Sequence, residues 1–165
     1  MTDKNHSETT EKMWTMMKGI GFAMLTTEDG GSLRARPMVA AQDEFDGNLW
    51  FFTRASSHKV QEAEGGNPVG VTYAEPSKQD YVSLSGNARL VRDKATIDAH
   101  WQESMKTWFP GGKDDPDVAL LKVEISMAEY WDAPNSVMVH AYGYVKAVLT
   151  GKPPSSGENE KLSFG

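Results

Sequence analysis

Short apolar segments separated by turn signals fill most of this chain, and their spacing allows few folds other than an antiparallel β structure. The turn signal Asp29-Gly30-Gly31 and the polar run 43–48 separate the first three segments. Connections this short join antiparallel neighbours, because a parallel pair needs a crossover of about a dozen residues or more. Strands are expected at residues 22–27, 32–42, 49–53, 69–74, 81–91, 118–131 and 137–149.

Together the segments predict a mainly β fold of the α+β class, with six or seven antiparallel strands and peripheral helices. Closing such a sheet into a barrel would remove its exposed edges. Gly86 interrupts the segment 81–91, which is typical of a bulge or of a bend in a barrel. A chain of 165 residues fits one domain. We expect residues 1–149 to form it, and residues 150–165, rich in Gly, Pro, Ser and charge, to be a flexible tail.

Three helices are predicted between or before the strands. Ser7 is the expected N-cap of the first, which ends at Gly19 and Gly21 and turns its Met and Trp side chains to the core. Either Ser56 or Ser57 can cap the second. Asp93 is the expected N-cap of the third helix. The apolar stripe of that helix consists of Ile97, Trp101, Met105 and Trp108.

Composition and charge exclude several classes of protein. A net charge of −6 argues against general affinity for nucleic acid or anionic membranes. No apolar run approaches the ~18 residues of a membrane span, and the polar N-terminus lacks a signal-peptide core, so a cytoplasmic protein is expected. The chain has no cysteine, which rules out disulfides and thiol chemistry. Its four histidines lack metal-ligand spacing, and the acidic turn 114–117 lacks a calcium-loop pattern, so we expect no metal site and a solvated turn.

One segment carries a chemical pattern: an arginine-bearing strand at 33–39, then an aromatic strand that runs into a cationic, hydroxyl-rich turn at 54–59. Backbone N–H groups at the helix start that follows, together with Ser57 and Lys59, would form an anion site suited to a phosphate monoester. The aromatic strand would give a planar heterocycle an apolar wall. A purely structural alternative remains open, in which Ser56 is only an N-cap and Lys59 is a solvated charge.

The order and spacing of four motifs resemble a known family. The chain is similar, from about residue 13 to 149, to the FMN-binding split barrels related to pyridoxamine 5′-phosphate oxidase, and most closely to their bacterial general stress protein branch. The motifs that carry this resemblance are Arg36-Pro37-Met38-Val39, Phe51-Phe52-Thr53 followed by Ser57-His58-Lys59, the Gly86 strand, and Tyr130-Trp131-Asp132. The resemblance implies a split β-barrel, a homodimer, and FMN, with FAD as an alternative, held between the subunits.

The same resemblance implies a set of cofactor-binding residues. Arg36 would lie close to the phosphate, and the Pro37–Met38 backbone close to the flavin ring. Trp131 would approach the flavin from the other subunit. The full implied set is Arg36, Pro37, Met38, Phe51, Phe52, Thr53, Ser57, His58, Lys59 and Trp131. The ring edge and ribityl chain would be lined by Phe51, Phe52 and Thr53. The phosphate would be held by Ser57 and Lys59, and His58 occupies a position where relatives often carry arginine.

Two departures from the oxidase pattern argue against vitamin oxidation. Residues 40–42, Ala-Ala-Gln, replace a stretch where the oxidase has a lysine near the flavin, and a nearby cation stabilises reduced flavin. The segment 152–165 has neither the arginine nor the histidine with which the oxidase reads its substrate. We therefore expect a redox-related, FMN-binding general stress protein without an identifiable catalytic residue. The alternatives are a flavin-dependent oxidase or reductase of a small substrate, and a non-catalytic binding module.

Overall fold

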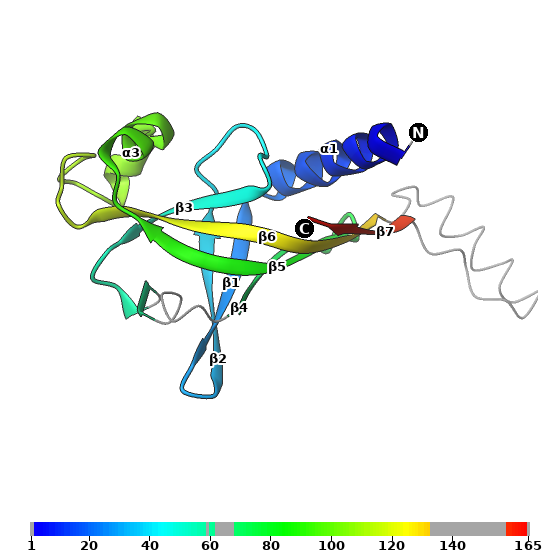
Figure 1. Ribbon diagram of the computed structural model, residues 1–165, viewed down its shortest axis with the longest axis horizontal. Coiled ribbons are helices and arrows are strands. Elements are labelled where there is room, and N and C mark those ends of the chain that lie inside the picture. The colour runs from blue at the N-terminus through cyan, green and yellow to red at the C-terminus, as the bar shows by residue number, and fades with distance from the viewer. Residues whose placement is uncertain (1, 59, 62–67, 133–157, 165) are drawn as a thin grey trace, which may run out of the picture.

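The computed structural model describes residues 2–58, 60–61, 68–132 and 158–164 (Figure 1). In this part of the chain a seven-stranded sheet is flanked by helices, and six of its strands are at predicted positions. The elements are α1 (Thr2–Ile20), β1 (Phe22–Asp29), β2 (Ser32–Val39), β3 (Asn48–Arg54), β4 (Pro68–Glu75), β5 (Asp80–Val91), α3 (Lys94–His100), the 3-10 helix η1 (Glu103–Thr107), β6 (Val118–Asp132) and β7 (Glu158–Ser163). The predicted strand 137–149 lies outside the described residues.

The sheet curls towards a barrel without closing. Its strand order is β2-β1-β4-β5-β6-β3, with β7 paired to β6, and every pairing is antiparallel. The two ends of this path meet in one bridge between Ala40 and Phe51, beside a 2.7 Å hydrogen bond from Ala41 N–H to the Trp50 carbonyl. A single bridge in place of a ladder leaves the barrel split, which confirms the expected fold class.

The longest pairing in the sheet joins β5 to β6 and contains a bulge at Gly86. The register shifts between Ser85 and Gly86, so that Gly86 lies opposite Ile125 while Ser85 lies opposite Met127. The main chains come so close here that a Cβ atom on Gly86 would lie 2.0 Å from the Glu124 carbonyl oxygen. Glycine is therefore required by the approach of backbone to backbone, in agreement with the predicted bulge.

Two clusters of buried side chains hold the sheet. The first fills the barrel, and α1 covers one opening by inserting Met13 and Met17, both almost completely buried, against the strands. The second lies outside the barrel wall, where Phe52 of β3 packs against Ile97 of α3 and Phe109. The prediction that the Met and Trp side chains of the first helix face the core is confirmed for Met13, Trp14 and Met17.

The helix boundaries correct two expectations. α1 begins at Thr2, so Ser7 is an interior residue and not the N-cap; the polar run before it contains no Gly or Pro to stop the helix. Its end agrees with the prediction, because Gly21 adopts φ +82° and its N–H donates to the Met17 carbonyl at 2.9 Å. No helix among the described residues is long and apolar enough to cross a membrane.

The third predicted helix starts as expected but divides in two. The Asp93 side chain accepts from the Thr96 N–H at 2.9 Å, which confirms the N-cap. α3 then ends at His100, because Trp101 is extended (φ −68°, ψ 131°), and η1 follows. In this position the Trp101 ring meets Phe52 edge-on at 5.4 Å between centroids. A tertiary contact thus overrides a local pattern that favours a continuous helix.

The C-terminal segment also differs from its prediction as a flexible tail. Residues Glu158–Ser163 form β7, which pairs with the second half of β6 from Met127 to Asp132. Leu162 is buried in the barrel cluster, and the Phe164 N–H donates to the Ser126 carbonyl at 2.8 Å. Composition missed this strand because the free edge of β6 supplies the hydrogen bonds that a polar segment cannot supply alone.

The close approach at Gly86 generates a stability prediction. Gly86→Ala should lower the free energy of unfolding by roughly 1–3 kcal/mol, because the added methyl group collides with main-chain atoms that cannot rotate away. Urea unfolding followed by circular dichroism measures this. Gly19→Ala is the matched control: it makes the same substitution near the end of α1, where an added Cβ meets nothing within 4 Å. It should be neutral or stabilising by up to about 1 kcal/mol. Equal losses in both variants would contradict the prediction.

A second prediction concerns pH. Burial raises the pKa of Asp80, and so does the negative charge of Asp132; Glu75 adds to this rise and Lys78 reduces it. One oxygen of the Asp80 carboxyl group is buried without a hydrogen-bond partner. The folded state therefore favours protonated Asp80, and ionised Asp80 costs stability at neutral pH. Asp80→Asn should raise Tm at pH 7 by about 2 °C at most, since the Asp80 and Asp132 carboxylates are partly exposed and solvent weakens their repulsion. The gain should shrink as pH falls towards about 4; a gain that grows on acidification would be contrary evidence.

Candidate functional site

The turn that leaves β3 is built by main-chain hydrogen bonds. The Ser57 N–H donates to the Arg54 carbonyl at 3.0 Å, and the Val60 N–H donates to the Ser57 carbonyl at 3.1 Å. Residues 58, 60 and 61 are helical, so this turn opens a helix as the sequence predicts. We call residues 54–58 the β3 turn. The N–H groups in the first turn of a helix are directed out of its end, where they favour anions.

The two serines of the β3 turn face different partners. The Ser57 hydroxyl lies 3.2 Å from the Thr53 hydroxyl, with which it shares a hydrogen bond. Ser56 instead bonds to Asp117: its N–H donates to Oδ1 at 3.0 Å and its hydroxyl to Oδ2 at 2.9 Å. Ser56 is thus tied to the strand beside it. This leaves Thr53, which is buried, and Ser57, which is half-buried, as the adjacent hydroxyl pair.

The arginine-bearing strand approaches the same end of the barrel. The antiparallel bridge between Ala40 and Phe51 directs Met38 and then Arg36 towards the end of β3 that carries Thr53. Arg36 is half-buried, and its Nη1 donates to the buried Thr27 hydroxyl at 2.6 Å. Thr27 and Thr53 are the two buried polar side chains among the described residues. Arg36, in the middle of β2, and Thr27, near the end of β1, thus form one polar pair. The Thr53 and Ser57 hydroxyls form a second pair where β3 ends.

Alternation along the strands separates the other predicted residues. Phe51 is completely buried inside the barrel, with Met38 in the same cluster, so both can offer a ligand little more than main chain within one subunit. Phe52 points the other way, against Trp101 and Phe109. Pro37 is exposed on the outer face of β2. The ring-lining roles of these residues stay predictions.

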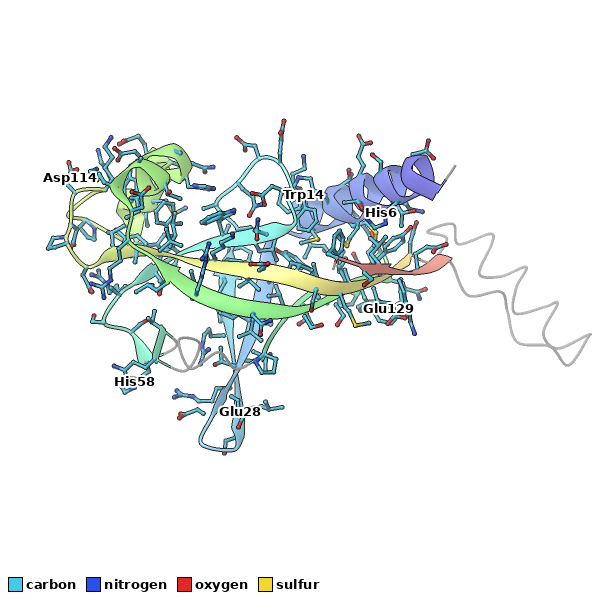
Figure 2. The ribbon with its side chains drawn as sticks, viewed as in Figure 1. His6, Trp14, Glu28, His58, Asp114 and Glu129 are labelled. Atoms are coloured by element: carbon cyan, nitrogen blue, oxygen red, sulfur yellow. The ribbon has the colours of Figure 1, made fainter. Side chains whose placement is uncertain are left out.

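The remaining three predicted residues lie apart from this cluster or outside the description. His58 is exposed, as Figure 2 shows at the outer side of the β3 turn. Lys59 lies outside the described residues. Trp131 is 39% exposed on β6. Trp131 lies thirteen positions along β6 from Val118, the partner of Arg54, which is about 40 Å in an extended strand. Trp131 can therefore meet the β3 turn only from a different subunit.

Two cavities lie on the other side of the loop between β2 and β3. One, of about 410 Å³, is lined by residues 41–44, Asp46, Trp50 and residues 99–102. The other, of about 620 Å³, lies between α1 and the same loop. None of the predicted cofactor-binding residues lines either one. Within the described residues no group of three His, Asp or Glu side chains could hold a metal ion.

Comparison with known proteins decides the family. A model described as pyridoxamine 5′-phosphate oxidase like matches residues 8–155. The chain belongs to this family. It is 28% identical to protein bli-3 of Neurospora crassa over 153 residues, which cover 86% of this chain and 73% of that protein. It is 24% identical to general stress protein 26 of Bacillus subtilis over 123 residues, which cover 73% of this chain and 86% of that protein. The general stress FMN/FAD binding protein from Xanthomonas citri is 32% identical, with a TM-score of 0.70 over 79% of this chain and 93% of that one.

The family match and the general stress relatives confirm the resemblance found in the sequence. Two further residues at the candidate site, Thr27 and Asp117, are not indicated by the sequence. Thr27 sits in an ordinary apolar strand, and nothing in its surroundings marks it. Asp117 belongs to the acidic turn 114–117, interpreted as solvated; Asp114 fits that interpretation with 76% side-chain exposure, but Asp117 is tied to Ser56. The proline at 116 and the strand that follows were the available signal, since they fix Asp117 at a strand entry.

Proposed function

We propose that this protein is a cytoplasmic, FMN-binding general stress protein with a redox-related role, in which the β3 turn holds the flavin phosphate. The observation that carries the proposal is the pairing of Thr53 and Ser57 hydroxyls at the opening of a helix, at the barrel end that Arg36 approaches. Hydroxyls, main-chain N–H groups and a guanidinium are the donors that phosphate binds in proteins. The FMN/FAD-binding relative from Xanthomonas citri supports the same ligand class.

The residues present fit a flavin nucleotide in chemical terms. Ser57 and Arg36 would hold the phosphate, with Lys59 and His58 beside them, and the main chain at Pro37–Met38 would run past the ring. When bound, flavin would supply redox chemistry. The chain's own contribution is to orient it and exclude water: Met38 and Phe51 close the barrel behind the strand, and Arg36 is held in place by Thr27.

A second subunit is part of the proposal. Four large apolar side chains are exposed on the outer face of the β1–β2 hairpin, which projects from the body of the molecule in Figure 1. Register places them on one face, with Phe22 opposite Val39 and Met24 opposite Pro37. The members of this outer face are Phe22, Met24, Leu33 and Val39. A partner over this face would cover them together with Pro37, and could bring its own Trp131 to the flavin.

Oxidation of pyridoxamine phosphate does not fit the same site. Ala41 is buried in the outer cluster, and Gln42 is occupied by the Glu44 and Asn48 carbonyls, so this stretch offers no cation to a reduced flavin. Lys161 in the C-terminal strand lies beside Glu129. Lysine also lacks the planar fork with which arginine grips phosphate. We therefore propose a flavin protein without a dedicated vitamin substrate.

The phosphate site predicts a preference between two ligands that share one ring system. FMN should bind about tenfold or more tightly than riboflavin, because one charge-assisted contact contributes roughly 1.5–3 kcal/mol. Ser57→Ala should reduce this preference, whereas Ser77→Ala, which removes a hydroxyl bonded to Glu75 in a distant turn, should not. Fluorescence-quenching titrations give both dissociation constants. Equal constants for the two ligands in the unmodified protein would remove the phosphate site.

The outer face predicts a homodimer at micromolar concentration. An obligate interface of this kind should bury more than about 2,000 Å² in total. Phe22→Asp combined with Met24→Asp should give a folded monomer with weakened FMN binding, because the charges cannot be buried in the interface. Trp108→Asp is the control, since Trp108 is 68% exposed but lies away from this face. Sedimentation velocity measures the state; a monomeric unmodified protein that still binds FMN would refute the intersubunit site.

A further inference from the structure

Asp117, at the entry to β6, holds the main chain of the β3 turn. Its carbonyl accepts from the Ala55 N–H at 2.8 Å. Its carboxylate accepts from the Ser56 N–H at 3.0 Å and from the Ser56 hydroxyl at 2.9 Å, and lies 3.7 Å from Arg54 Nη1. Three consecutive residues of the turn thus depend on one residue that is 61 positions away from Ser56 in the chain.

The main chain that carries this carboxylate is itself fixed in place. The Asp117 N–H donates to Asp115 Oδ1 at 2.9 Å, and the Val118 N–H donates to the Asp115 carbonyl at 3.0 Å. Arg54 is fixed as well, because its Nη2 donates to the Trp108 carbonyl at 3.4 Å and its guanidinium lies 5.4 Å from the centre of the Phe109 ring. The hydrogen bonds from Ser56, first from its N–H and then from its hydroxyl, and more weakly Arg54, lower the pKa of Asp117, so it is ionised at neutral pH.

This arrangement assigns separate tasks to neighbouring residues. Ser56 and Arg54 are turned towards Asp117, and so neither is directed at the hydroxyl pair of Thr53 and Ser57. Locking Ser56 fixes the direction of the next residue, because only two soft torsion angles separate consecutive peptide planes. Charge alone would give Asp117 the opposite role, since a carboxylate near a phosphate repels it. Arg54 offsets that repulsion.

We propose that Asp117 is the positioning residue of the phosphate site: it acts through Ser56 to present Ser57 and the His58 N–H to an anion, without touching the ligand. The inference rests on the proposed function, because it assumes that the anion is the phosphate of a flavin nucleotide. It goes further by naming a residue whose negative charge is needed for the binding of a negative group.

The sign of one substitution separates positioning from charge. Asp117→Asn keeps the size of the side chain but removes the charge and one acceptor oxygen. If Asp117 positions the turn, the ratio of the riboflavin to the FMN dissociation constant should fall about fivefold or more, on the scale of one lost hydrogen bond. The riboflavin constant should stay unchanged, because the ring contacts are untouched. If charge dominates, FMN should bind more tightly and the ratio should rise.

Two further variants complete the experiment. Asp114→Asn makes the same change of charge at a carboxylate that pairs with Lys94 at 2.7 Å, well away from His58 in Figure 2, and should leave the ratio unchanged. Ser56→Ala removes the hydroxyl that bonds to Asp117 and should lower the ratio. In the double variant Ser56→Ala with Asp117→Asn, the loss of FMN preference, expressed as a free energy, should be smaller than the sum of the two single losses. Both substitutions break the same contact between Ser56 and Asp117.

The outcomes distinguish this inference from the proposed function. If the riboflavin and FMN dissociation constants of the unmodified protein are nearly equal, there is no phosphate site, and the role of Asp117 is contradicted with it. A clear FMN preference that survives unchanged, or increases, in folded Asp117→Asn overturns only the positioning role. Circular dichroism and Tm establish whether each variant is folded. If Asp117→Asn does not fold, Ser56→Ala decides: the inference requires a lower ratio, and an unchanged ratio overturns it.

Discussion

The pairing of β5 with β6 is the interaction on which the rest of the molecule depends. One edge of β6 receives β5, while its other edge receives β3 along the first half and β7 along the second. β5 in turn carries β4, β1 and β2. The bulge at Gly86 adjusts this ladder where the backbones come closest, and a bulge increases the local twist of a sheet. That curvature brings the free ends, β2 and β3, back to one another at Ala40 and Phe51.

Because β3 is aligned on β6, the candidate site inherits its geometry from that ladder. Arg54 pairs with Val118, which places the β3 turn directly beside Asp117. Alternation along β3 then divides its side chains: Phe51 and Thr53 face the barrel, while Phe52 faces the outer cluster with Trp101 and Phe109. The rigid strands thus carry packing on both faces, and polar chemistry is confined to the place where they end. Sites on loops held by a rigid scaffold follow this pattern.

The sequence was informative wherever the cause of a structure is local. Six of the predicted strand segments, the Asp93 cap and the helix start after Ser57 arise from neighbouring residues and are found among the described residues. The bulge at Gly86 is found as well, signalled by the glycine itself. Features set by distant partners could not be predicted. The helix break at Trp101 comes from its contact with Phe52, β7 exists because β6 has a free edge, and the role of Asp117 appears only once β3 and β6 are aligned. Family resemblance supplied the candidate site residues, but not the fact that Phe51 is buried.

An acidic protein can still build an anion site, because local geometry outweighs net charge at hydrogen-bond distance. The charge of −6 is spread over the surface, where solvent and salt screen it beyond about 10 Å. At the β3 turn the nearest carboxylate is compensated twice, by the N–H and hydroxyl of Ser56 and by Arg54. What the turn then offers is a set of oriented dipoles: the half-buried Ser57 hydroxyl, bonded to the buried Thr53 hydroxyl behind it, and the N–H groups at a helix start. Such dipoles need no reorganisation when an anion arrives. In the proposed site, a half-buried acid behind the donors therefore costs little in repulsion and fixes them in place.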